Sequence, residues 1–262
     1  MRKAPEFFIG LAVFLIVAGG IIFCAMMTLL GWDFTRLDTR KFVQESVTKE
    51  GNIKKLSIKD STADIRIKKS DDDKFHVDFD VPKKAKYDVT VDGDTLSVEF
   101  EDSKKWTEHI FNVRSPKITI AVPAKQYELL KINSSTGDIT IESGFTFDSV
   151  DIRVSTSDVE MKSLTATELT LRTSTGDIEI DGLEADKVEL KGSTADFKLK
   201  RLTVASNFSI ETSTGEVWCS FTHDVNVDAK TSTGDIKAAS TDTGVPCWIR
   251  TSTGDVTVKR EK

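Results

Sequence analysis

A chain of 262 residues that is 39% hydrophobic and 30% charged has the composition of a folded protein, which excludes wholesale disorder. Its net charge of −6 argues against a nucleic-acid partner, because the phosphates would be repelled. Three cysteines are too few for a disulfide framework, and no pair of them has the spacing of metal ligands.

The first feature along the chain is an uncharged apolar run at residues 7–30. As a helix it would span roughly 36 Å, which is enough to cross a hydrocarbon core of about 30 Å. The alternative is a signal peptide cleaved near Ala18-Gly19-Gly20, but the run continues well beyond the roughly 7–15 apolar residues typical of a signal. The pattern predicts a transmembrane helix at residues 7–30 after a short cytoplasmic tail at residues 1–6.

Charges flank this run on both sides, with Arg2 and Lys3 before it and Arg36 and Arg40 after it. Long domains cross a membrane largely regardless of flanking charge, so Arg2 and Lys3 decide the orientation. We expect a single-pass protein of the cell membrane with a large extracytoplasmic C-terminal domain. Residues 31–52 are polar and mixed, which predicts a juxtamembrane linker with some helix.

A tetrad of Ser, Thr, a small residue and an acid recurs eight times in the rest of the chain. Its acids are Asp64, Asp138, Asp158, Asp177, Asp196, Glu216, Asp235 and Asp255. The last seven acids are 19 or 20 residues apart, and apolar residues alternate with polar ones on both sides of each tetrad. Alternation with a period of two predicts strands with one buried face.

The repeat predicts an all-β protein, a β-solenoid (β-helix or β-roll) of coils of about 19–20 residues, regular over residues 132–262. No single coil can bury its apolar face, so stacked coils about 4.8 Å apart must cover one another. A further apolar residue in each unit is expected to plug the core beneath a return loop. These residues are Phe145, Leu164, Leu183, Leu202 and Phe221.

Residues 53–131 hold an opening coil around the first tetrad and then a long excursion from the repeat. The excursion contains three alternating stretches, at residues 75–79, 87–91 and 96–100, and a return at residues 118–123. Asp92-Gly93-Asp94 predicts a hairpin turn between the second and third stretches. Because solenoid ends need covering, we expect the excursion to form a sheet-like cap.

The opposite end is expected at Val256-Thr257-Val258, guarded only by the charges of residues 259–262. Such an open edge could stack on the same edge of another copy, which predicts end-to-end self-association of the protein.

The third tetrad position holds Gly five times, Ala twice and Ser once. A turn strictly requiring positive φ would use Gly or Asn, so close approach of neighbouring coils is at least as important here. Stacked acids about 4.8 Å apart repel by roughly 0.9 kcal/mol even in water. We expect turn N–H groups to accommodate them. Bound calcium is the alternative, although the Gly-rich calcium nonapeptide is absent and we predict no metal site.

Catalytic motifs are absent: there is no HExxH, no GxSxG and no phosphate-binding glycine loop, and the histidines His76, His109 and His223 share no motif. We therefore predict no catalytic residues, no cofactor and no enzyme. Cys219 and Cys247 fall on alternating apolar stretches and are expected in the core, with a disulfide between them as the alternative.

Three tryptophans could form sugar-stacking platforms, although single exposed aromatic residues are common. They are Trp106, Trp218 and Trp248.

An N-terminal anchor followed by repeated S-T-G-D-I-x-I units resembles the putative-adhesin β-strand-repeat family, bacterial membrane-anchored domains of unknown function. The resemblance covers about residues 53–258. It implies a β-solenoid at the bacterial envelope and brings no catalytic residues. Ala63, Ser157, Ala195 and Glu216 depart from the commonest unit, so the turns are not identical ligand sites.

Three classes of function follow. The first is a membrane-anchored adhesin or binding module of the cell envelope, with cell-wall glycan or another envelope protein as its partner. The second is a non-enzymatic scaffold or stress-signalling accessory that works through a membrane protein. The third, a polysaccharide-acting enzyme, would need a local cluster of carboxylates or basic residues that does not repeat, whereas the polar residues here follow the repeat.

Overall fold

The computed structural model describes residues 4–32, 41–101 and 114–261. The chain divides into two compact units, one holding the helix and the other holding the strands. The helix, α1 (Ala4–Leu29), carries no charged residue after Glu6 and has a mean hydropathy of 2.7 over Phe8–Leu29. By length and composition it can cross a membrane, and a signal sequence near the N-terminus would have the same properties.

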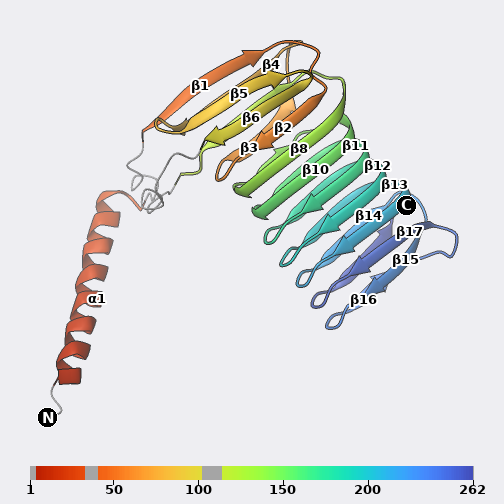
Figure 1. Ribbon diagram of the computed structural model, residues 1–262. Helices are drawn as coiled ribbons and strands as arrows, with labels where there is room; N and C mark the ends of the chain where they lie inside the picture. Colours follow the sequence, from red (N-terminus) through yellow and green to blue (C-terminus); the bar gives the residue numbers. More distant parts are fainter. Residues whose placement is uncertain (1–3, 33–40, 102–113, 262) are drawn as a thin grey trace. The chain divides into compact units, whose positions relative to one another are not determined.

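The described residues of the other unit form eighteen strands joined in one sheet (Figure 1). They are β1 (Phe42–Lys49), β2 (Lys55–Lys59), β3 (Asp64–Lys69), β4 (Phe75–Pro82), β5 (Lys86–Asp92), β6 (Thr95–Glu101), β7 (Lys117–Val122), β8 (Gln126–Thr136), β9 (Ile139–Ile141), β10 (Phe145–Thr156), β11 (Val159–Arg172), β12 (Ile178–Lys191), β13 (Phe197–Glu211), β14 (Val217–Phe221), β15 (Val225–Lys230), β16 (Ile236–Ala238), β17 (Val245–Arg250) and β18 (Val256–Arg260). The expected all-β, solenoid-like winding is confirmed.

Three parallel ladders run along the winding. The pre-turn ladder contains the strands that precede each tetrad, and the post-turn ladder contains those that follow it. In the middle of the molecule both ladders pair in chain order, so that Leu171 lies beside Leu190 and Ile178 lies beside Phe197. The tetrads line up between these ladders, as bridges between Thr156, Thr175 and Thr194 show.

The third ladder corrects one expectation, because the return segment is part of the long strands β10 to β13 and is not a loop. Phe145 pairs with Leu164, Leu164 with Leu183, and Leu183 with Leu202. We call these pairs the return ladder. A backbone that recurs in register at each coil can satisfy its donors and acceptors in the coils on either side, and an irregular loop cannot.

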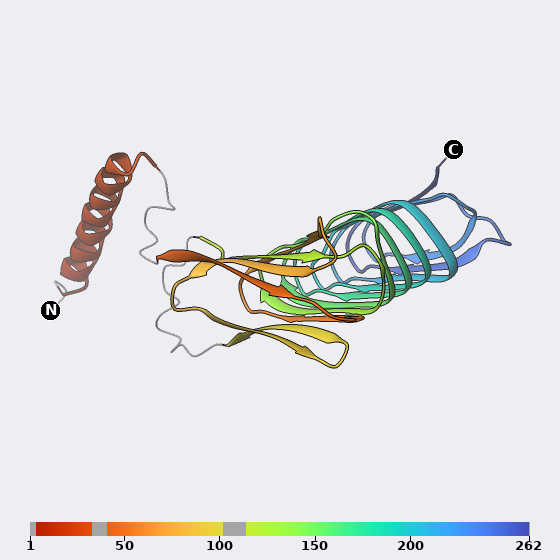
Figure 2. The same ribbon diagram turned by 90° about the horizontal axis from the view of Figure 1, so that it is seen from above.

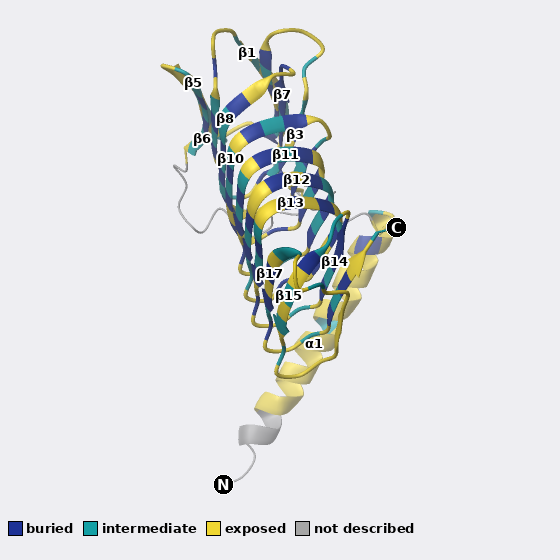
Figure 3. Cartoon of the chain, turned by 90° about the vertical axis from the view of Figure 1, so that its right-hand side faces the viewer, coloured by how far each residue is buried: buried dark blue, intermediate teal, exposed yellow. Residues whose placement is uncertain are grey.

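The core is a set of stacked apolar columns. Ile152, Leu171, Leu190 and Ile210 follow one another in the pre-turn ladder, and each is fully buried. Burial of one such side chain stabilises the fold by about 1.5–3 kcal/mol, so several per coil can offset the ordering entropy. Figure 3 shows the resulting bands of buried and exposed residues along the strands.

At one end, the sheets continue into antiparallel strands (Figure 2). β6 pairs with β2 and β7 with β3, both in parallel, and the hairpin of β5 and β6 then extends one side while β4 extends the other. The expected hairpin is therefore present, with its turn at Gly93 and Asp94.

The linker expected at residues 31–52 is wrong in its second half, because residues 42–49 form β1, which pairs antiparallel with β4. The strand was missed because it lies at the sheet edge. Only one neighbour covers it, so its alternation is weak and even Val43 and Val47 are only half-buried.

The open end was expected at Val256-Thr257-Val258, and this expectation is wrong. The last two coils stack out of chain order. β17 lies between β13 and β15, and β18 lies between β14 and β16 (Figure 1). Backbone bonds follow the same order: Val217 N donates to Asp255 O at 2.9 Å, and Val256 N donates to Asp235 O at 2.8 Å. The final coil, residues 245–260, is thus inserted, and residues 225–238 form the open end.

Apolar content explains this order. An interior coil is covered on both sides, whereas an end coil is covered on only one. The inserted coil supplies Ile249 and Val258, which are buried. The end coil has Ala229 and Ala238 in the equivalent places, and its Ile236 is 44% exposed.

Candidate ligand-binding groove

A Ser or Thr hydroxyl before the tetrad fixes the turn in most coils, a feature that sequence reasoning missed. Thr173 Oγ1 donates to Thr175 O at 3.1 Å, and Thr212 and Thr251 make the same bond two residues onward. Such short hydroxyl-to-backbone bonds favour turns over continued strands. The signal was available, since Ser or Thr precedes five of the eight tetrads.

The third tetrad position alternates between two kinds of turn. Gly176 has φ of +130°, and a Cβ there would lie 2.1 Å from the carbonyl oxygen of Ser157 in the next coil. Ala63, Ser157 and Ala195 occupy alternate coils, each facing a glycine, and their small side chains are buried. Glycine is therefore needed both for its backbone conformation and for close approach, but only in every second coil of this part of the ladder.

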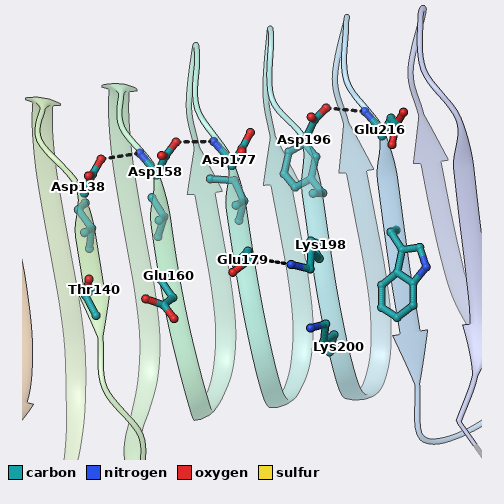
Figure 4. A pocket seen from close by; sticks show the side chains of 15 residues that line it. Asp138, Thr140, Asp158, Glu160, Asp177, Glu179, Asp196, Lys198, Lys200 and Glu216 are labelled. Atoms are coloured by element: carbon teal, nitrogen blue, oxygen red, sulfur yellow. Dashed lines mark hydrogen bonds and ion pairs between the residues drawn. The ribbon is translucent and has the colours of Figure 1, made fainter.

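The acids form a continuous column in which a carboxylate accepts a hydrogen bond from the next coil (Figure 4). Asp158 N donates to Asp138 Oδ1 at 3.2 Å, and Asp177 N donates to Asp158 Oδ1 at 2.8 Å. Asp196 Oδ1 likewise accepts from Glu216 N at 2.7 Å. The expected capping of turn N–H groups is confirmed for these three carboxylates, but each of them caps the neighbouring turn and not its own.

One oxygen of these carboxylates is thereby held in place. Within the described part of the chain, the second oxygen of Asp138, Asp158 and Asp196 has no protein donor. Asp177 differs because its carboxylate accepts no such bond from Asp196 N among the described residues. Burial, followed by the charges of Asp158, Asp196 and Glu179, raises the pKa of Asp177.

Beside the acid column the post-turn ladder carries a mixed row, in which Glu160 pairs with Glu179, Glu179 with Lys198, and Lys198 with Trp218. A hydrogen bond from Lys198 lowers the pKa of Glu179. Lys259 Nζ lies 5.6 Å from the centroid of the Trp218 ring.

Together the acid column and this row line a groove of about 750 Å³ that crosses several coils (Figure 4). Its volume is in the range of protein ligand sites, and it is bounded by carboxylates along one side and by Lys198, Lys200 and Trp218 towards one end. We call it the acidic groove.

In the described ranges 4–32, 41–101 and 114–261, no group of three or more His, Cys, Asp or Glu side chains is placed to hold a metal ion. Stacking explains the geometry of the acids, because neighbouring carboxylates point along the column and do not converge on one point.

His76 and His223, the histidines in the described part of the chain, do not form a site with each other. His76 Nε2 lies 2.9 Å from Asp72 Oδ1, and this contact, with bonds from Lys74 N and Ser70, lowers the pKa of Asp72 to about 2. The ring of His223 packs edge-on against Phe221, and burial lowers its pKa. His109 lies outside the described residues.

Both cysteines of the β unit are free and buried, which confirms them as core side chains. Burial raises the pKa of Cys247 to about 12 and that of Cys219 well above its usual range. Trp218 and Trp248 lie on different ladders and form no common platform. Trp106 falls outside the described residues.

These features define a class: a parallel, repetitive β protein that holds ordered polar side chains on its outer faces. The chain belongs to the Toastrack DUF4097 family, whose model matches residues 53–262. The family match confirms the resemblance drawn from the tetrads, and a structure of a putative adhesin is among the structural neighbours. No curated protein matches the sequence.

Three solved structures are similar to this chain, and the first of them supports the fold. A putative adhesin from Bacteroides fragilis has a TM-score of 0.57 at 20% identity, over 85% of this chain and 98% of that one. A putative lipid binding protein from Parabacteroides distasonis gives 0.46 at 16% identity, over 84% and 97%. A putative cell adhesion protein from Clostridium sporogenes gives 0.41 at 12% identity, over 84% and 100%.

Proposed function

We propose that this protein is a non-enzymatic, adhesin-type binding module of the bacterial envelope. It is a solenoid of 19–20-residue coils, held at the membrane by α1 with the solenoid extracytoplasmic. The acidic groove carries this proposal: its carboxylates have one oxygen held by a backbone N–H and a second oxygen free for a ligand.

The groove suits an extended polymer better than a compact metabolite. Its free carboxylate oxygens recur once per coil, about 4.8 Å apart. They favour ammonium and hydroxyl donors, since bonds between charged groups are stronger than neutral ones. We therefore propose an amine-bearing glycan of the envelope as the ligand, lying across the coils with its amino groups on the acid column.

The fixed carboxylates also support binding over catalysis. Asp138 and Asp158 each accept the same kind of hydrogen bond, from a backbone N–H of the next turn. Glycoside cleavage instead needs two carboxyl groups with different environments, one protonated and one ionised.

A titration of the full chain in detergent micelles with the tetramer of glucosamine tests the groove. We expect saturable binding that weakens with salt, because exposed charges are screened. The double variant Asp138→Asn with Asp158→Asn should weaken binding at least tenfold. Asparagine keeps an acceptor oxygen for the turn while it removes the charge.

Glu168→Gln is the matched control, because Glu168 lies outward on the pre-turn ladder, beside Lys187 and away from the groove. It should bind like the unaltered protein. Equal affinity in the double variant, or equal loss in the control, would count against the groove.

The open end favours a second candidate, a scaffold that associates with a second copy of itself. β15 and β16 each have a sheet neighbour on only one side, and Ile236 is 44% exposed there. Ser240 Oγ accepts from Val227 N at 2.9 Å, so part of this edge is already covered by its own chain. Sedimentation of the full chain should show dimers that Ile236→Lys abolishes, and a monomer at all concentrations would rule the scaffold out.

A further inference from the structure

We propose that the pre-turn ladder carries a second binding site, centred on Trp248, that takes a neutral pyranose ring of a glycan. This site goes beyond the acidic groove, because it lies on another ladder and its ligand chemistry requires no charge.

The insertion of the final coil builds this site. Trp248 lies between Ser209 of β13 and Asp228 of β15, and Pro246 lies beside Asn226. Stacked in chain order, β15 would lie directly against β13. The inserted β17 instead separates β13 from β15 by twice the strand spacing, about 9.5 Å, and places Pro246 beside Asn226.

The result is a shallow pocket of about 510 Å³ whose floor is apolar and whose rim is polar. Trp248 is 37% exposed and Pro246 is exposed beside it. Asn207, Ser209 and Asn226 line the pocket around them. This composition, an apolar surface with a few convergent polar groups, is typical of small-ligand sites.

Asp228 also lines the pocket, and its charge is neutralised by Arg250. The Arg250 guanidinium lies 4.4 Å from the centroid of the Trp248 ring and pairs with Asp228. Arg250 Nη1 also donates to Asp228 O at 2.6 Å. The arginine therefore holds the indole ring in place, and the pair leaves the pocket without net charge, which argues against a phosphate or an ammonium ligand.

A pyranose ring has the matching chemistry. Its C–H face can stack on an aromatic face, whose negative potential attracts the C–H groups, while its hydroxyls both donate and accept. Asn226 Nδ2 donates to Asp242 O at 3.3 Å, which leaves its carbonyl oxygen free to accept. Ser209 Oγ donates to Val188 O at 3.3 Å and keeps its acceptor capacity. Asn207 has no side-chain partner among the described residues, so both ends of its amide are available.

The test is a titration of the full chain in detergent micelles with two neutral probes, the tetramers of N-acetylglucosamine and of glucose. We expect saturable binding of at least one probe, with little dependence on salt. Trp248→Ala should weaken it at least tenfold, whereas Trp248→Phe, which keeps an aromatic face, should weaken it less. Asn207→Ala should weaken it several-fold.

Glu168→Ala, outward on the same ladder in an earlier coil, is the control and should bind the neutral probe normally. Trp248→Ala should still bind the glucosamine tetramer through the acidic groove. Loss of glucosamine-tetramer binding in the groove variants would say nothing against neutral-probe binding at Trp248. The two proposals can therefore fail separately.

Three results would overturn the Trp248 site: absence of saturable binding of both neutral probes, unchanged affinity in a folded Trp248→Ala variant, or binding of a proline-rich peptide in place of the sugars. The melting temperature of each variant shows whether it is folded.

Discussion

The middle coils and the last two coils are built from the same repeat but are assembled differently. In the middle, each coil lies on the one that precedes it in the chain, as Ile178 beside Phe197 illustrates. At the C-terminal end, residues 245–260 lie between two coils that are adjacent in sequence. The comparison teaches that the repeat fixes the shape of a coil, while apolar content decides which coil is covered on both sides.

The largest expected effect breaks the close approach of the middle coils. Gly176→Leu places a Cβ 2.1 Å from the Ser157 carbonyl oxygen at a φ that disfavours side chains. We expect a loss of more than about 3 kcal/mol in the free energy of unfolding, measured by denaturant titration. Glu179→Gln, an exposed change in the same coil, should lie within about 0.5 kcal/mol of the unaltered protein. Equal stability of the two variants would contradict the close contact assigned to Gly176 between neighbouring coils.

A core truncation compares the inserted coil with the end coil. Ile249→Ala removes a fully buried side chain and should cost about 2–5 kcal/mol. Ile236→Ala, at a side chain 44% exposed, should cost less than about 1 kcal/mol. Chemical denaturation measures both. Similar costs would mean that the end coil is covered after all.

The stacking order itself can be trapped by engineered cysteines. Trp218 pairs with Thr257 across the β14–β18 ladder, whereas chain-order stacking would place Lys237 there. We expect oxidation to cross-link Trp218→Cys with Thr257→Cys, and not Trp218→Cys with Lys237→Cys. Mass spectrometry identifies the bond. Cross-linking of the second pair alone would show that the coils stack in chain order.

The smallest expected effect concerns the acid column. The raised pKa of Asp177 means that the folded protein binds its proton more readily than the unfolded chain does. Its contribution to stability is therefore greatest at low pH and is lost as pH rises through the folded pKa. Asp177→Asn should raise the melting temperature slightly at pH 7 and not at pH 3, as calorimetry can measure. A larger gain in melting temperature at pH 3 than at pH 7 would show that folding lowers the pKa of Asp177 and does not raise it.

Much of the fold was predictable because the repeat is explicit. The tetrads, the alternation and the plug residues identified stacked strands, and the hairpin turn was readable at Gly93 and Asp94. β1 was not predictable, because an edge strand covered on one side needs little apolar patterning. The return ladder was missed because its paired stretches, such as Phe145–Phe147 beside Leu164–Ala166, cover only three residues, too short a pattern to distinguish from a loop.

The groove was predictable in part. The sequence placed the acids in one column and named turn N–H groups as their partners, but it could not say that acids such as Asp138 and Asp158 cap the turn of the next coil. It also could not show that alternate turns differ, since Gly176 and Ser157 occupy the same tetrad position and only their contact across coils assigns them different conformations.

By itself the sequence determined the coil: which side chains point inward, where the chain turns, and which residues recur at each turn. These follow from local alternation and spacing, which each unit carries within its own residues. Only the tertiary structure decided which coils are neighbours. The contacts between coils are made by equivalent residues in every unit, so local pattern permits several orders, and the total apolar surface covered selects one of them.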